Sequence, residues 1–83
     1  MKDMKDWDMH WLTEAKEQLM HRQIVDVRYM TKEEADDMDW YCRPVVMVLD
    51  DGNLIYPSCD DEGNNGGALF TNNEANPVLP VLR

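Results

Sequence analysis

The sequence predicts one small, mostly β domain: an N-terminal helix, then a five-stranded, strongly bent antiparallel barrel with a short helical insert after the first strand. Its 83 residues suffice for one domain and not two. Apolar residues recur at helical spacing only near the N-terminus. Further on, short β-rich runs alternate with turn residues, as is typical of small antiparallel folds. We therefore expect a single domain over 1–83, with 1–7 frayed, a helix at 8–23 and the barrel at 24–83.

The expected helix 8–23 is amphipathic and is favoured at its start by two acids, Asp6 and Asp8. Trp7 and Trp11 lie four residues apart on the same side, where a pair of indoles is more typical of a core than of a cofactor site. One apolar face is formed by Trp11, Leu12, Ala15, Leu19 and Met20.

The period then changes to that of a strand over Ile24–Met30, with every second side chain apolar. This pattern predicts a half-buried strand whose inward residues are Val25, Val27 and Tyr29. Thr31 and Glu34 form a capping box, which predicts a short helix through Met38 with Ala35 and Met38 turned inward.

The clearest strand signal is Val45–Leu49, which follows Pro44, is apolar on both faces and so predicts a strand buried on both sides. The acidic, Gly-containing segment 50–53 predicts a tight turn, and Leu54–Tyr56 the returning strand of a hairpin. After a polar loop at 58–67, we expect a strand at Ala68–Thr71, a loop at 72–77 and a last strand at Val78–Leu82, which Pro80 confines to an edge.

Charge is the strongest compositional feature. Seventeen acids oppose eight bases, for a net charge of −9, and no Lys or Arg lies between Arg43 and Arg83. Because nucleic-acid affinity comes mainly from Lys and Arg on phosphates, the C-terminal half disfavours generic DNA or RNA binding. The acids predict either a solvated surface or a face that meets a basic partner.

Signals for metals and catalysis are weak. Two distant cysteines, Cys42 and Cys59, are expected to be reduced thiols, with a disulfide or a zinc site completed by His10 and His21 as alternatives. The oxygen-rich segment 60–65 could bind calcium but lacks the EF-hand spacing, and 63–67 lacks the Lys of a phosphate loop. We therefore expect no cofactor, no metal and no enzymatic activity.

The most distinctive string is Trp40-Tyr41-Cys42-Arg43-Pro44. Tyr41 and Arg43 could form an aromatic and cationic binding surface. The alternative is structural: Trp40 fills one end of the barrel while Tyr41 and Arg43 stay half exposed.

Together with 29–35, 49–52, 60–64 and 67–70, this string resembles small uncharacterised proteins of marine cyanophages and cyanobacteria over residues 24–83. That group in turn resembles the Sm-like small barrels, the class of Sm, Lsm and Hfq proteins. The resemblance implies a barrel that pairs edge strands between subunits into a homo-oligomeric ring. It also implies an RNA site in the loops after the second and fourth strands, with Asp51, Asn53, Asn72 and Asn73 as its candidate residues. The second loop lacks the Arg or Lys of that class.

Two functions follow as expectations. The first is a non-enzymatic Sm-like module that self-associates into a ring and binds RNA or, more in keeping with its charge, a protein. The second is an acidic, phage-type decoy that occupies a basic nucleic-acid-binding site on a host protein. No apolar run is long enough to cross a membrane and no signal peptide is visible, so a cytoplasmic location, in the host if the protein is of phage origin, is expected.

Overall fold

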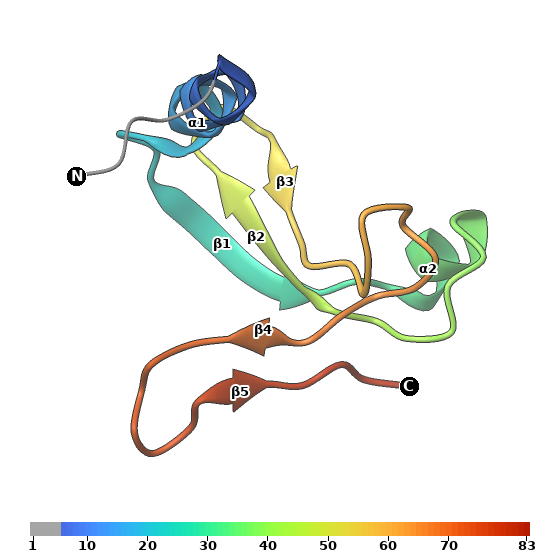
Figure 1. The fold of residues 1–83 in the computed structure, drawn as a ribbon. Coiled ribbons are helices and arrows are strands. Elements are labelled where there is room, and N and C mark those ends of the chain that lie inside the picture. The colour runs from blue at the N-terminus through green and yellow to red at the C-terminus, as the bar shows by residue number, and fades with distance from the viewer. Residues whose placement is uncertain (1–5) are drawn as a thin grey trace.

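A computed structural model describes residues 6–83 of the chain (Figure 1). The helix α1 runs from Asp6 to Leu19, so Asp6 and Trp7 are helical where fraying was expected; the rest of that expected frayed segment, 1–5, lies outside the described residues. The helix also ends earlier than predicted. His21 has the left-handed φ of 62°, a conformation that commonly terminates helices.

The strand that was predicted to be buried on both sides is the central strand of a three-stranded sheet. β2 (Val45–Leu49) lies between β1 (Ile24–Tyr29) and β3 (Leu54–Ile55), antiparallel to both. The predicted β2–β3 hairpin is confirmed: Gly52 takes a φ of 88°, and the Leu49 N–H donates to the Asn53 carbonyl over 2.9 Å. Asp-Gly turns favour this positive φ, which accounts for the accuracy of the prediction.

The prediction that Val25, Val27 and Tyr29 of β1 point inward is wrong for the two valines. A bulge between Ile24 and Asp26 breaks the alternation, and Val25 and Val27 are both exposed. Beyond the bulge the register pairs Val27 with Met47, and Met47 with Ile55. Directly paired residues share a sheet face, so one face carries Ile24, Val27, Met47 and Ile55, together with Val45 and Leu49, which are both buried. We call it the open face.

The main buried cluster lies on the opposite face, where Val46 is almost fully buried. The helix α2 (Lys32–Asp37) closes it, starting at the predicted capping box of Thr31 and Glu34. Ala35 points inward as expected, but Met38 is the C-cap and is partly exposed. The buried cluster is formed by Met30, Ala35, Trp40 and Val46, with Tyr56 packed against it.

Trp40 fills this core from the segment after α2. It is only 4% exposed, its ring meets Tyr56 edge to face at 5.8 Å, and its indole N–H donates to the Gly63 carbonyl over 2.6 Å. The space-filling role expected for Trp40 is therefore confirmed, although the enclosure is a sheet and a helix.

The C-terminal strands form a separate two-stranded sheet of β4 (Leu69–Phe70) and β5 (Val78–Leu79). Isolated bridges from Arg43 to Leu82 and from Ser58 to Gly66 hold this part of the chain in place. Since neither sheet pairs with the other, the described strands make two small open sheets and no closed barrel. The strand order and the helical insert were predicted correctly, but closure requires long-range pairing that the local patterns do not encode.

Candidate functional site

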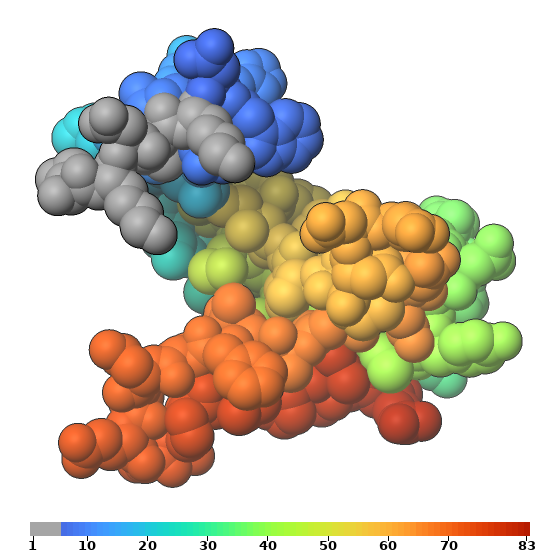
Figure 2. Space-filling model, in the orientation of Figure 1, coloured from blue at the N-terminus to red at the C-terminus, as the bar shows by residue number. Residues whose placement is uncertain are grey.

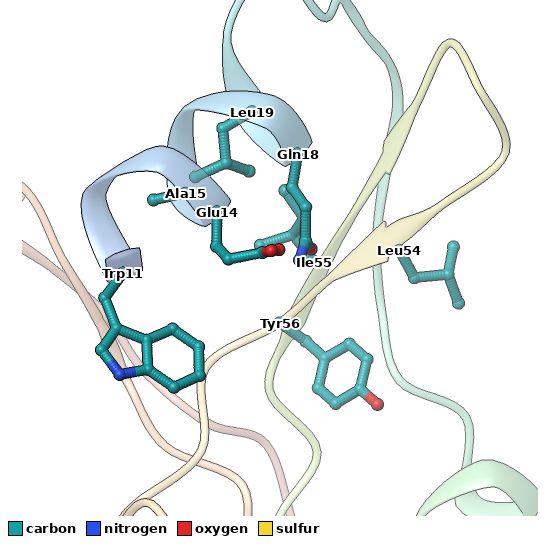
Figure 3. A pocket seen from close by; sticks show the side chains of 8 residues that line it. All are labelled: Trp11, Glu14, Ala15, Gln18, Leu19, Leu54, Ile55 and Tyr56. Atoms are coloured by element: carbon teal, nitrogen blue, oxygen red, sulfur yellow. The ribbon is translucent and has the colours of Figure 1, made fainter. Parts of the chain in front are cut away.

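A groove with a volume of about 430 Å³ lies between α1 and β3 (Figure 3), and a second pocket of about 530 Å³ is lined by Trp7, Trp11 and Asp61. Trp11, Ala15 and Leu19 project from α1, and Ile55 rises toward them from β3. The other lining residues are Glu14, Gln18, Leu54 and Tyr56. The groove is thus mostly apolar, as interaction pockets usually are.

This groove continues onto the open face of the sheet. Ile24 and Val27 share that face with Ile55 through the strand register, and both are more than half exposed. Figure 2 shows the molecule hollowed between α1 and the β4–β5 hairpin, where this face forms the floor. We call the groove and the open face together the apolar surface.

The helix α1 has no buried residue and leaves Trp7, Met9, Trp11 and Leu19 about half exposed or more. Trp7 is 67% exposed and packs edge to face on Trp11, with ring centroids 5.8 Å apart. His10 also meets Trp11 edge to face at 5.1 Å. The expectation that the two indoles belong to the core is wrong for the single chain: they form an aromatic cluster on its surface.

Few charged side chains of residues 6–83 lie beside the apolar surface. Asp61 lies beside Trp7 and Trp11, and Glu14 is the one that lines the groove. At its end, Arg22 reaches Asp50 at 3.9 Å and Asp51 at 3.3 Å, which ties α1 to the β2–β3 turn. The Asp50 N–H also donates to the Gln23 carbonyl over 2.9 Å. Two exposed ion pairs and one backbone hydrogen bond therefore hold the end of α1 near the sheet, although no side chain of α1 is buried against it.

The four residues of the expected RNA site lie in two separate places. Asp51 and Asn53 belong to the β2–β3 turn, where the Asp51 carboxylate accepts from the Asn53 backbone and side-chain N–H groups at 3.0 and 3.1 Å. Asn72 and Asn73 belong to the β4–β5 loop, where Asn73 accepts from the N–H groups of Ala75 and Asn76 at 2.9 and 3.1 Å. Figure 1 places the two turns at opposite ends of the molecule, so one copy does not bring them together.

Tyr41 and Arg43, in contrast, line one small pocket beside α2. Tyr41 is fully in solvent and Arg43 is half buried. The predicted aromatic and cationic neighbours therefore meet in space.

The metal and disulfide alternatives have little support in the described residues. Cys42 and Cys59 are both free thiols there, and no three His, Cys, Asp or Glu side chains converge between residues 6 and 83. The Asp60 carboxylate instead accepts from the Asn64 side chain at 2.8 Å and from the backbone N–H groups of Asn64 and Glu62. These donors, those of Asn64 foremost, lower the Asp60 pKa below its usual value, so the oxygen-rich segment is used to shape its own turn.

Sequence reasoning missed the apolar surface because it assigned the apolar side chains of α1 and β1 to the core. One available signal was chain length, since a domain this small has a marginal core of its own. No family model matches the chain, and no curated protein and no solved structure is similar to it. Among the described residues, none of the helices has both the length and the apolar character needed to cross a bilayer.

Proposed function

We propose that the protein is a non-enzymatic interaction module that self-associates through the apolar surface of α1 and β1. The observation that carries this proposal is that an amphipathic helix with two tryptophans, together with the adjoining strand, is not covered by any other part of residues 6–83. Exposed apolar patches of this kind, rimmed by polar residues, are typical of protein interfaces.

The dimensions of the single chain support the same conclusion. Its accessible surface is 6815 Å², whereas a compact monomer of this mass exposes about 5,100 Å². Its radius of gyration is 14.7 Å, against about 12 Å for a compact domain of equal length. A standard interface covers about 800 Å² of each partner, so the excess surface is comparable to one or two interfaces per copy.

A second copy of this chain can also pair with the sheet, because the sheet has two open edges next to the apolar surface. In the order β1-β2-β3, the outer edges of β1 and β3 pair with no strand in residues 6–83. Open edges are templates for pairing with another chain. Pairing unlike edges head to tail generates a ring, the arrangement that the Sm-like resemblance implies, whereas pairing β1 with β1 closes a dimer.

For the further ligand of this assembly we favour a protein over RNA. Between Arg43 and Arg83 the chain has six acids and no Lys or Arg, so phosphate neutralisation would depend on few residues.

Self-association is tested by light scattering behind a sizing column, with absorbance read at 260 and 280 nm on the same peak. We expect a discrete mass of several 9.7 kDa copies and no co-eluting nucleic acid. Val27→Asp, on the open face, and Trp11→Ala, on α1, should each shift the protein toward monomer. Met38→Asp is the matched control, since Met38 is exposed on α2 behind the opposite face. A wild-type monomer at high concentration, or equal effects of Val27→Asp and Met38→Asp, would contradict the proposal.

The acidic decoy is the second candidate, and one structural observation favours it. The Trp40–Gly63 hydrogen bond joins the acidic loop 58–67 to the segment after α2, beside Asp36 and Asp39, although Asp61 of that loop lines a pocket with Trp7 and Trp11. Acids from two segments therefore gather at one end of the molecule. A decoy should compete with DNA for a basic host protein, and the competition should vanish in high salt. A monomeric protein that competes in this way would replace the self-association proposal.

A further inference from the structure

A pocket of about 190 Å³ lies at the junction of α2, the segment after it and the C-terminal residue. Ala35 and Trp40 form its apolar wall. Its polar lining consists of Lys32, Asp36, Tyr41, Arg43 and Arg83. Three cations therefore face one small pocket in a protein whose net charge is −9.

These cations differ from the arginines elsewhere in the described chain. Arg22 and Arg28 form ion pairs with carboxylates. Lys32, Arg43 and Arg83 are not within 4.0 Å of any Asp or Glu side chain of residues 6–83. Among residues 6–83, three cationic side chains and one acidic side chain, Asp36, line the pocket, while Asp39 lines the adjoining pocket that Trp40 and Tyr41 share.

Arg43 is held in place but lacks good acceptors. Its backbone exchanges hydrogen bonds of 2.7 and 2.9 Å with Leu82. Its guanidinium has two long contacts within residues 6–83, from Nη1 to the Met30 carbonyl at 3.5 Å and from Nη2 to a backbone oxygen of Arg83 at 3.4 Å. Its Nε is buried without a partner and is out of reach of a ligand, so only the two Nη groups can bind one. A guanidinium has five N–H donors, so this one has unused capacity for an oxyanion.

Tyr41 adds a flat surface at the mouth of the pocket. It is 87% exposed, although its backbone is fixed: the Asn65 side-chain oxygen accepts from the N–H groups of Tyr41 and Cys42 at 3.1 and 3.0 Å. Nothing in the fold requires a large aromatic side chain in solvent at this position. Exposed aromatic rings beside cations are platforms on which planar ligands stack.

We infer that this pocket binds a small ligand in which an oxyanion is joined to a planar ring, as in a mononucleotide. The oxyanion lies among Lys32, Arg43 and Arg83, and the ring stacks on Tyr41 outside the pocket. The site fits one anionic group and not a nucleic-acid strand, because a strand requires a row of cations along its phosphates and these cations lie around one small pocket. This inference does not depend on self-association, since α2 lies on the side of the sheet away from the open face.

Calorimetric titration with adenosine 5′-monophosphate tests the inference, with inorganic phosphate and adenosine as separate titrants. We expect the monophosphate to bind more tightly than either part alone. Lys32→Gln and Tyr41→Ala should each weaken its binding, the former by about tenfold. Lys16→Gln is the matched control, because it removes the same charge from α1, outside the residues that line the pocket, and should change the affinity less than about twofold.

Circular dichroism and thermal unfolding establish that each variant is folded, which is expected because Lys32 and Tyr41 are both exposed. No binding of the monophosphate at millimolar concentration would overturn the inference. Equal losses in Lys32→Gln and Lys16→Gln would overturn it too, since they would reveal only general electrostatics. Equal affinity for adenosine and its monophosphate would overturn the oxyanion site, and equal affinity for phosphate and the monophosphate would overturn the stacking role of Tyr41.

Discussion

The ion pair of Arg28 and Glu34 joins β1 to the start of α2, and replacing Glu34 by Gln should destabilise the domain in a pH-dependent way. Arg28 donates two hydrogen bonds to the carboxylate, of 2.8 and 3.0 Å. Glu34 also accepts from the Thr31 N–H at 2.9 Å as part of the capping box. Gln can keep the capping contact, so the variant removes mainly the charge.

The size of the effect follows from the pKa of Glu34. The hydrogen bond from Arg28, followed by that from Thr31, lowers this pKa from 4.5 to about 2. Such a shift sets a ceiling of about 3 kcal/mol on the free energy of unfolding. The Glu34 side chain is 38% exposed, and solvent screens exposed pairs, so we expect about 1 kcal/mol at neutral pH. For a domain of this length that lowers Tm by about 4–8 °C.

The sign of the pH dependence is fixed by the lowered pKa. Stability from a carboxylate with a lowered folded pKa is fully present above the unfolded value and is lost as pH falls through the folded one. The difference between wild type and Glu34→Gln should therefore close between pH 4.5 and about 2. Urea unfolding at several pH values measures it, with the neighbouring Glu33→Gln as control. A difference that is independent of pH, or equal in both variants, would refute the reasoning.

Three further substitutions test the packing around α2 and the loop that covers it. Trp40→Phe removes the hydrogen bond to Gly63 and part of a buried ring. The free energy of unfolding, measured by urea unfolding, should therefore fall by about 2–3 kcal/mol. A loss below about 0.5 kcal/mol would mean that this contact is not stabilising. Gly66→Ala should destabilise by about 1–3 kcal/mol, because a Cβ there would lie 2.6 Å from Pro44 Cδ and 2.8 Å from the Cys42 carbonyl oxygen. Gly63→Ala has open space around it and a φ of +71°, so it should lose only about 1 kcal/mol, and the reverse order would contradict the described packing.

Local signals account for the parts of the fold that the sequence predicts well. The capping box at Thr31 and the Asp-Gly turn at Gly52 each depend on residues a few positions apart, and both occur as expected. The bulge at Val25 and the Trp40–Gly63 bond depend on residues or strands distant in the chain, so the alternating pattern alone could not reveal them. Barrel closure failed as a prediction for the same reason.

The candidate sites follow the same division. The sequence could assign Tyr41 and Arg43 to one site because they lie two residues apart. Arg83 reaches the same pocket only because the chain before it forms a bridge between Leu82 and Arg43. The apolar periodicity of α1 marked an apolar face of the helix, and the prediction that this face belongs to the core is wrong for residues 6–83. Periodicity does not say whether that face is covered by the same chain or by another one, and here the chain leaves it open.

The two proposed sites lie on different parts of the molecule, and this separation has a functional consequence. β2 presents Met47 to the open face and Val46 to the core beneath α2, so the central strand divides the two sites. Subunits that meet through α1 and β1 would leave the pocket of Lys32, Tyr41 and Arg43 accessible on every copy. An assembly built in this way would present several identical pockets, and the binding of a multivalent ligand would gain from their effective concentration.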